Sequence, residues 1–281
     1  MASLIPPCES QTGPLGLVYP VESVSKLTCR HRKRCKDGEP VRLRLGNLHA
    51  YLITGGKSVQ HVFRSSRDLT FEEFALRVAH KVKGLPAHDT ALVARDLSGS
   101  SRVPLTTTTE EERIWRKFHE LYESHLIGGG AVSSLTDLFV DNLMEQFRSV
   151  GEAECGVDEL MKDKMFRAST VALAGPGVFD ADPDFAETFW TYDADFMSLL
   201  YGLPRFLCRG GWQARDRCLE TVRRYLEKGW QGVDWSDVGE GDPSWEPNFG
   251  SKLVREREVA MEKYGISLRG RASFQMGLIW S

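Results

Sequence analysis

The chain has 281 residues, 41% of them hydrophobic, which is enough for one large domain or two small ones, each with a buried core. Its 36 Lys and Arg nearly balance 39 Asp and Glu, and the net charge of -3 excludes a global field that would attract nucleic acid. Ten per cent aromatic residues argue against disorder, and six scattered cysteines without a CxxC pair indicate neither a disulfide framework nor a closed zinc site.

Residues 1–23 are predicted to be a loose lead-in, because they are rich in Pro, Gly and Ser and show no sustained period. The longest apolar stretch there, Leu15 to Val21, is interrupted by Gly16 and Pro20. It is too short for a transmembrane span or a signal-peptide core. We therefore expect neither a membrane anchor nor a signal peptide in this segment.

A basic run, Cys29-Arg-His-Arg-Lys-Arg-Cys-Lys36, ends the first helical pattern. Such a run can bind an anionic membrane surface or nucleic acid. It is equally typical of a solvated helix end, where positive charge is favoured by the helix dipole. Both interpretations stay open from the sequence, and the helix-dipole argument favours the second.

The next segment alternates apolar and polar residues on both sides of Gly46-Asn47, from Pro40 to Thr54. This pattern predicts a β-hairpin. A short helix is expected from Ser58 to Phe63, and a second from Phe71 to Val82 before Gly84. Residues 86–109 show weak patterning and are predicted to be a long loop.

A clear helix start follows at Thr109, where the threonine and Glu112 have the spacing of a capping box. Three consecutive glutamates at the positive end of a helix add favourable charge. Apolar residues then recur at helical spacing from Ile114 to Tyr122 until Gly128-Gly-Gly130. We expect one helix from 110 to 126.

The remainder of the chain is predicted to be helical, with turn signals between the elements. The expected helices are residues 135–147, 157–174, 183–200, 213–227 and 249–265, with a long connection over residues 230–247. A final apolar run, Ala272 to Trp280, has no stop signal. The fold class is therefore mainly α with a small N-terminal β-sheet (α+β), and the lack of βαβ alternation argues against a doubly wound nucleotide-binding fold.

Several segments, taken in their order and spacing, resemble fungal cytochrome P-450 haem-thiolate monooxygenases. The group in question is similar to sterol and bile-acid 7-alpha-hydroxylases and prostacyclin synthase. The resembling segments are residues 42–46, 51–53, 96–100, 112–119, 189–193, 202–204, 214–217, 255–257, 265–267 and 277–280. The resemblance implies that residues 24–281 form the N-terminal part of one cytochrome P-450-like domain, a partial fold truncated near the start of the long central helix.

The resemblance also implies a haem cofactor and its contacts. The helix at 110–126 would lie over one haem face, with Trp115 and His119 against a haem propionate. Members of the family normally carry Arg at the second position, and an imidazole pairs more weakly because it is only partly protonated near neutrality. The alternative is that Trp115 is a core residue and His119 a polar edge. No catalytic residue and no metal ligand is assigned in this chain.

By the same resemblance, the substrate is an apolar small molecule and the electron donor a cytochrome P-450 reductase. Substrate contacts are expected at two places, Leu97, Ser98 and Arg102 in one loop, and Phe196, Leu200 and Leu203 around a helix end. Ordinary core and turn roles are the alternative for these residues. A cytoplasmic protein, or one peripheral at the endoplasmic reticulum, is expected, with no nucleic-acid partner.

Oxygen activation in this family requires a cysteine thiolate on the iron, whose electron donation favours O–O cleavage. The corresponding cysteine loop is expected after Ser281. The stretch Phe147 to Gly156 looks like that loop, but its spacing is off by one and two glutamates beside Cys155 would disfavour a thiolate. Glu110-x-x-Arg113 and Glu220-x-x-Arg223 are interpreted as surface ion pairs.

Two interpretations follow for the chain. One is a monooxygenase-like protein of fungal secondary metabolism, acting on a sterol-, terpenoid- or polyketide-like substrate when full-length and inactive alone. The other is a non-catalytic helical interaction protein or decayed paralogue. The first also predicts that a central helix cut in mid-course exposes the apolar face of Phe274, Met276, Leu278 and Ile279.

Overall fold

The computed structural model describes residues 40–45, 48–65, 69–127, 129–148, 150, 156–232, 235 and 241–280. These residues form a mainly helical fold with a small antiparallel sheet near the start, which confirms the predicted fold class. The lead-in, the basic run at 29–36 and residues 151–155, which include Cys155, lie outside the described residues. Within the described residues, no helix is both long enough and apolar enough to span a bilayer.

The chain divides into two compact units, residues 1–70 and 71–281. The described part of the first unit holds strands β1 (Val41–Leu45) and β2 (Leu48–Leu52) and helix α2 (Gly56–Arg64). The strands pair antiparallel with Val41 opposite Leu52 and Leu45 opposite Leu48, so the predicted hairpin is confirmed. Helix α2 confirms the predicted short helix and extends it by a few residues.

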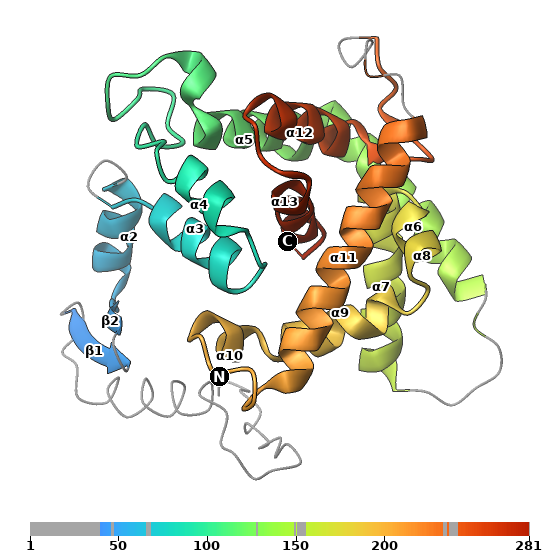
Figure 1. The fold of residues 1–281 in the computed structure, drawn as a ribbon, viewed down its shortest axis with the longest axis horizontal. Helices are drawn as coiled ribbons and strands as arrows, with labels where there is room; N and C mark the ends of the chain where they lie inside the picture. The colour runs from blue at the N-terminus through green and yellow to red at the C-terminus, as the bar shows by residue number, and fades with distance from the viewer. Residues whose placement is uncertain are drawn as a thin grey trace, which may run out of the picture. The chain divides into compact units, whose positions relative to one another are not determined.

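The second unit is built almost entirely of helices (Figure 1). In chain order they begin with α3 (Glu72–Lys81), α4 (Ala87–Val93), η1 (Glu110–Glu112), α5 (Ile114–Tyr122), the π-helical η2 (Glu123–Ile127), α6 (Gly129–Arg148), α7 (Val157–Ala174) and α8 (Gly177–Ala181). The rest are α9 (Phe185–Ala194), α10 (Phe196–Leu200), α11 (Arg209–Gly232), α12 (Lys252–Lys263) and α13 (Leu268–Trp280). A short antiparallel hairpin, whose strands β3 (Trp245–Glu246) and β4 (Gly250–Ser251) have two residues each, precedes α12.

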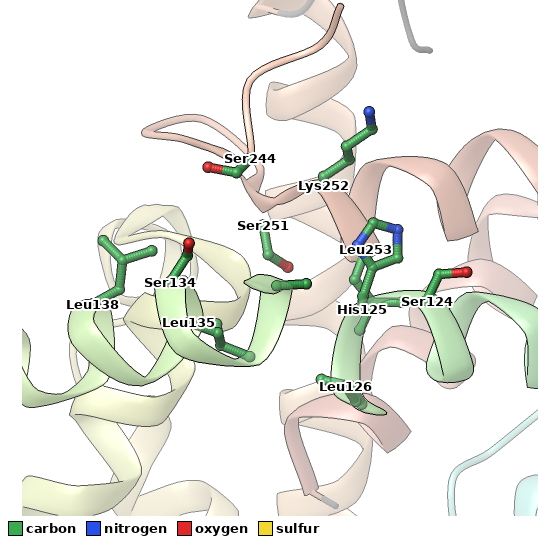
Figure 2. Close-up of a pocket in the computed structure, with 11 residues that line it drawn as sticks. Ser124, His125, Leu126, Ser134, Leu135, Leu138, Ser244, Ser251, Lys252 and Leu253 are labelled. Carbon is green, nitrogen blue, oxygen red and sulfur yellow. The ribbon is translucent and has the colours of Figure 1, made fainter. Parts of the chain in front are cut away.

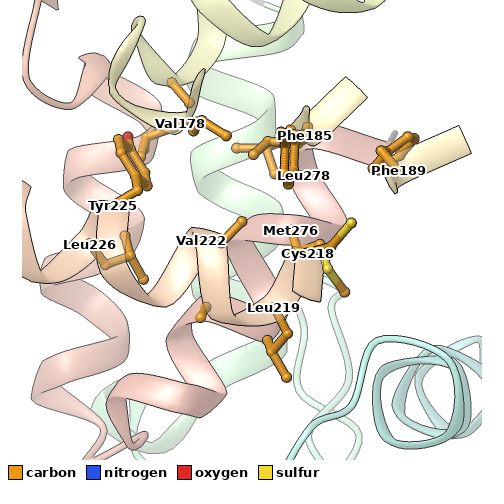
Figure 3. Close-up of a cluster of buried hydrophobic side chains, with 14 of the residues drawn as sticks. Val178, Phe185, Phe189, Cys218, Leu219, Val222, Tyr225, Leu226, Met276 and Leu278 are labelled. Atoms are coloured by element: carbon orange, nitrogen blue, oxygen red, sulfur yellow. The ribbon is translucent and has the colours of Figure 1, made fainter. Parts of the chain in front are cut away.

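The core of this unit lies around α11, which packs against α8, α9 and α13. Cys218, Leu219, Val222, Tyr225 and Leu226 recur at helical spacing and are all buried (Figure 3). Figure 3 shows Met276 and Leu278 of α13 beside this stripe, with aromatic residues of α9 above it. The apolar stripe on α11 therefore fixes the positions of α9 and α13.

Helix α13 contacts α3, α7, α11 and α12 and lies in the middle of the second unit in Figure 1. The prediction that this helix exposes an apolar face is wrong. Phe274, Met276, Leu278 and Ile279 are all buried. Helix α13 is enclosed by the preceding α12 and by α3, α7 and α11, which are more distant in the sequence, a packing that local periodicity does not reveal.

Two further predictions need correction. The loop expected at 86–109 contains a helix, α4, which begins after Pro86. Asp89 of this helix is buried and accepts hydrogen bonds from the backbone N–H (2.9 Å) and the hydroxyl (2.5 Å) of Ser267. A contact 178 residues away therefore stabilises a helix whose sequence pattern is weak. The single helix expected at 110–126 is interrupted at Arg113, which leaves helical geometry between η1 and α5 (φ -88°, ψ 77°). After Tyr122 the helix continues directly into the π-helical η2.

Candidate functional site

A cavity of about 330 Å³ lies between α3, α5, α12 and α13, all in the second unit. Its wall is mostly aromatic and apolar, with a few charged side chains. The lining residues that bear on its chemistry are Glu72, Lys83, Ser100, Trp115, Phe118, His119, Tyr122, Arg257, Phe274 and Gly277. Aromatic walls with a few placed polar groups are typical of small-molecule sites.

Helix α5 supplies the aromatic wall. Trp115, Phe118, His119 and Tyr122 are three and four positions apart, so they share one face of the helix. Phe118 packs edge-on against Phe274 of α13, with ring centroids 5.3 Å apart. The backbone N–H of Trp115 donates to Asp96 Oδ2 at 2.9 Å, which fixes the start of α5 against the preceding loop.

The loop before α5 is held by Arg113, whose side chain is 1% exposed. Its guanidinium donates to Ser98 Oγ at 3.3 Å, to the carbonyl of Arg102 at 3.2 Å and to the carbonyl of Ser101. It also pairs with Glu110 at 2.8 Å. The predicted ion pair is confirmed, but it is not a surface pair on the arginine side, because the Arg113 side chain is buried beneath the loop that it holds.

His119 lies at the rim of the cavity, with 47% of its side chain exposed. Its Nε2 is 3.5 Å from Glu123 Oε1, one turn further along. An acidic neighbour at this distance competes with any anion for the imidazole. The structure thus brings Trp115 and His119 to one cavity, while their assignment to a propionate stays a prediction.

Two basic side chains from outside α5 also line the cavity. Arg257 of α12 is 2% exposed, and its guanidinium lies over the rings of Phe118 (5.6 Å) and Tyr122 (5.3 Å). Lys83 follows α3, and burial together with the charge of Arg257 lowers its pKa to about 8. The cavity wall therefore carries two basic side chains close enough to affect one another.

Glu72 is the acidic residue that lines this cavity. Its Oε1 accepts hydrogen bonds from the backbone N–H and the hydroxyl of Ser100, both at 2.9 Å. Burial opposes ionisation of Glu72, but hydrogen bonds from its own N–H and from Ser100 outweigh it and lower the pKa of the carboxyl. Glu72 thus ties α3 to the loop at Ser100.

The predicted substrate residues are spread over different surroundings. Ser98 is buried and donates to Asp96 Oδ1 at 2.6 Å, whereas Leu97 is exposed and lines a separate, more open hollow beside residues 106–108. Arg102 is exposed, and its carbonyl accepts from Arg113. None of the three is among the residues that line the aromatic cavity.

The second predicted group lies at and after α10. Phe196 and Leu200 are partly buried and pack against the main core, and the carbonyl of Leu203 accepts from Trp212 Nε1 at 3.1 Å. These residues do not line the aromatic cavity either. Their role in substrate contact stays a prediction.

Arg257, Lys83 and Phe274 were not identified as site residues from the sequence. A signal for Arg257 was present, since it occupies an inward position of α12 at helical spacing from Leu253, Val254 and Met261, which are all buried. A charged residue in an apolar stripe marks a buried charge that needs a partner. Lys83 and Phe274 gave no comparable pattern.

A second cavity, of about 250 Å³, lies between η2, α6 and the start of α12 (Figure 2). Figure 2 shows His125, Ser134 and Leu253 facing it from these three elements. His125 Nε2 is 2.9 Å from Glu256 Oε2, and Lys252 Nζ is 3.9 Å from Glu256 Oε1. Glu256 contacts both basic side chains of this cavity, which weakens their attraction for an ionised ligand.

The two described cysteines, Cys208 and Cys218, are buried. Burial raises the pKa of both thiols, that of Cys218 to about 12, so the thiolate form is disfavoured at each. The described residues contain no group of three or more His, Cys, Asp or Glu arranged to hold a metal ion. The described cysteines therefore lack the character of iron ligands.

Comparison with known proteins gives three fungal relatives, although no family model matches the chain. The cytochrome P-450 monooxygenase calL of Penicillium decumbens is 28% identical over 231 residues, which is 79% of this chain and 42% of that protein. The cytochrome P-450 monooxygenase efuG of Hormonema carpetanum is 24% identical over 253 residues, or 87% and 42%. A third, fsoE of Humicola fuscoatra, is 29% identical over 122 residues.

The chain is similar to fungal cytochrome P-450 monooxygenases. It spans about two fifths of the length of the first two relatives, since the matched regions cover 42% of each. The similarity concerns part of each relative, and all three relatives are named as cytochrome P-450 monooxygenases. It does not distinguish the sterol and bile-acid hydroxylase group from other cytochromes P-450.

Proposed function

We propose that this chain supplies part of the haem and substrate enclosure of a cytochrome P-450 monooxygenase that hydroxylates an apolar small molecule. A sterol-, terpenoid- or polyketide-like compound of fungal secondary metabolism is the proposed substrate class, with a cytochrome P-450 reductase as electron donor. The observation that carries the proposal is the cavity walled by Trp115, Phe118 and Phe274 over a buried arginine. Similarity to three monooxygenases supports the same assignment.

The chemistry of the cavity wall supports the proposal that its residues contact part of a porphyrin. A porphyrin is a flat apolar body with carboxylates at one edge, and the cavity offers aromatic rings together with a buried guanidinium. Within the described part of the chain, the Nε and Nη1 atoms of Arg257 have no hydrogen-bond partner. Trp115 and Phe118 would hold the ring, and haem, when bound with a thiolate ligand, would supply the oxygen-activating chemistry.

We propose in addition that residues 1–281 alone do not perform the reaction. The described cysteines are buried neutral thiols, and a haem-thiolate centre needs an ionised one. The chain's own contribution would be to bind and orient ligands and to exclude water from the cavity. The thiolate would come from residues other than Cys208 and Cys218.

The test is to purify residues 1–281, add haemin, and record the absorbance spectrum and the quenching of tryptophan fluorescence. We expect saturable binding that is weakened about tenfold by Trp115→Ala. The control is Trp212→Ala, because Trp212 lies on α11 and does not line the cavity. We expect no carbon monoxide difference absorbance of a thiolate-ligated haem.

Two results would count against this proposal. A stable, monomeric chain that binds no haemin would favour the non-catalytic helical protein. A thiolate-type carbon monoxide difference spectrum from the chain alone would show that one of its own cysteines ligates iron, and the proposed inactivity would be wrong.

A further inference from the structure

Arg257 differs from the other buried arginines in how its charge is compensated. Each of the other four has a carboxylate within hydrogen-bond distance: Arg113 with Glu110 (2.8 Å), Arg116 with Glu120 (2.8 Å), Arg215 with Asp216 (2.5 Å) and Arg255 with Asp242 (2.8 Å). No carboxylate among the described residues lies within ion-pair distance of Arg257. Its Nη2 donates instead to the carbonyl of Phe274, at 3.2 Å.

The guanidinium of Arg257 is therefore buried away from water with part of its hydrogen-bonding capacity unused. Arg257 is 2% exposed, and its Nε and Nη1 are buried without a hydrogen-bond partner among the residues that the structure describes. Contact with the faces of Phe118 and Tyr122 compensates the charge only in part. Burial of a cation without a paired anion is strongly unfavourable, so an anion from outside the described residues is expected at this position.

The surroundings of Arg257 include a second basic side chain. Lys83 lines the same cavity and feels the positive charge of Arg257. Gly277 of α13 gives the lysine room, since a Cβ at this position would lie 2.4 Å from Lys83 Nζ. Glu72, the acid in the wall, already accepts two hydrogen bonds from Ser100.

We infer that Arg257, with Lys83 beside it, is the carboxylate-binding end of the aromatic cavity. The ligand it selects is amphipathic, with a carboxylate at α12 and an apolar body against Trp115, Phe118 and Phe274. Two sources provide this chemistry, a propionate of a porphyrin and the carboxylate of an apolar organic acid. The porphyrin source rests on the proposed function, while the organic-acid source does not.

A pair of matched variants separates a binding role from a structural one. If Arg257 is retained for a ligand, Arg257→Met removes an uncompensated buried charge and leaves the ligand-free chain at least as stable as wild type. Arg255→Met is the control, because Arg255 is equally buried but bonded to Asp242 and to the carbonyl of Gly250 (2.6 Å). We expect Arg255→Met to lower the urea midpoint clearly and Arg257→Met not to lower it.

Binding is then measured by tryptophan fluorescence with two pairs of probes. Protoporphyrin is compared with its dimethyl ester, and dodecanoate with dodecanol, so that within each pair only the carboxylate changes. We expect at least one acid to bind about tenfold or more tightly than its neutral partner. Arg257→Met should abolish that preference, and Arg257→Lys should restore part of it.

The outcomes separate this inference from the proposed function. A porphyrin preference lost in Arg257→Met supports both, and a preference for dodecanoate alone supports the carboxylate site while it weakens the porphyrin assignment. Equal binding of acid and neutral probes, no binding of either pair, or wild-type discrimination by Arg257→Met would overturn the inference. A lower urea midpoint for Arg257→Met would show a structural role instead.

Discussion

Lys83 places an amine in a cavity that already contains a buried guanidinium, and its protonation is therefore costly. Burial, with a smaller contribution from Arg257, lowers its pKa to about 8, against about 10.4 in an unfolded chain. Between these two values the unfolded state binds more protons than the folded state. The free energy of unfolding from this group consequently rises as the pH increases through that window, and the cost is fully present below pH 8.

The first prediction isolates this effect by difference. Relative to Lys83→Met, the wild-type chain should gain about 2 kcal/mol in free energy of unfolding between pH 7.5 and pH 10. Urea titrations at a series of pH values measure it. Taking the difference removes the contributions of other groups, such as Tyr225, whose pKa is raised by burial. A difference that stays constant with pH would mean that Lys83 is not desolvated in the folded state.

The elements show where local sequence signals are sufficient and where they are not. The hairpin β1–β2 and the bounds of α7 follow from alternation and helical spacing, with turn residues at their ends. Helix α4 and the hairpin β3–β4 were missed, because their stability depends on distant contacts such as that of Asp89 with Ser267. A short element that is stabilised mainly by tertiary contacts has too few residues to show a hydrophobic periodicity in its own sequence.

The same distinction applies to the candidate site. Trp115 and His119 came from a motif on one helix face, whereas Arg257 and Phe274 reach the cavity from helices more than 130 residues later in the sequence. Their proximity depends on how α12 and α13 pack on α5, which one sequence alone does not determine. Only the presence of an arginine in the apolar stripe of α12 hinted at it.

Gly250 shows how tightly one pair of elements is joined. It has φ +67°, and a Cβ there would lie 2.4 Å from the backbone carbonyl carbon of Ala174 at the end of α7. Contact with backbone cannot be relieved by rotating a side chain. The close approach of β4 to α7 therefore requires a residue without a Cβ.

We expect Gly250→Ala to destabilise the chain by more than about 3 kcal/mol, because backbone strain and steric overlap add. Gly202→Ala is the matched control, since Gly202 has φ +69° but no atom lies within 4 Å of the position that a Cβ would occupy there. The control should cost only the conformational term, about 1–2 kcal/mol. Equal urea midpoints for the two variants would show that the β4–α7 contact is looser than described.

At the scale of the whole molecule, the second unit has a continuous core in which α9, α11 and α13 are joined by buried side chains. Met276 of α13 is fully buried within this core, next to the apolar stripe of α11 (Figure 3). Because the interior of a protein is close-packed, truncation of such a side chain leaves a cavity, and the packing of every helix around it is weakened. The unit should therefore unfold as one body.

The last prediction compares two methionine deletions. Met276→Ala should lower the free energy of unfolding by about 2–5 kcal/mol, whereas Met144→Ala, at a 51% exposed site on α6, should change it by less than about 0.5 kcal/mol. Tryptophan fluorescence and far-UV circular dichroism should report one coincident urea transition in both variants, since the tryptophans of α9 and α11 border the core that Met276 fills. Separate transitions in Met276→Ala would mean that α13 unfolds independently of α9 and α11, and that the core is not a single cooperative body.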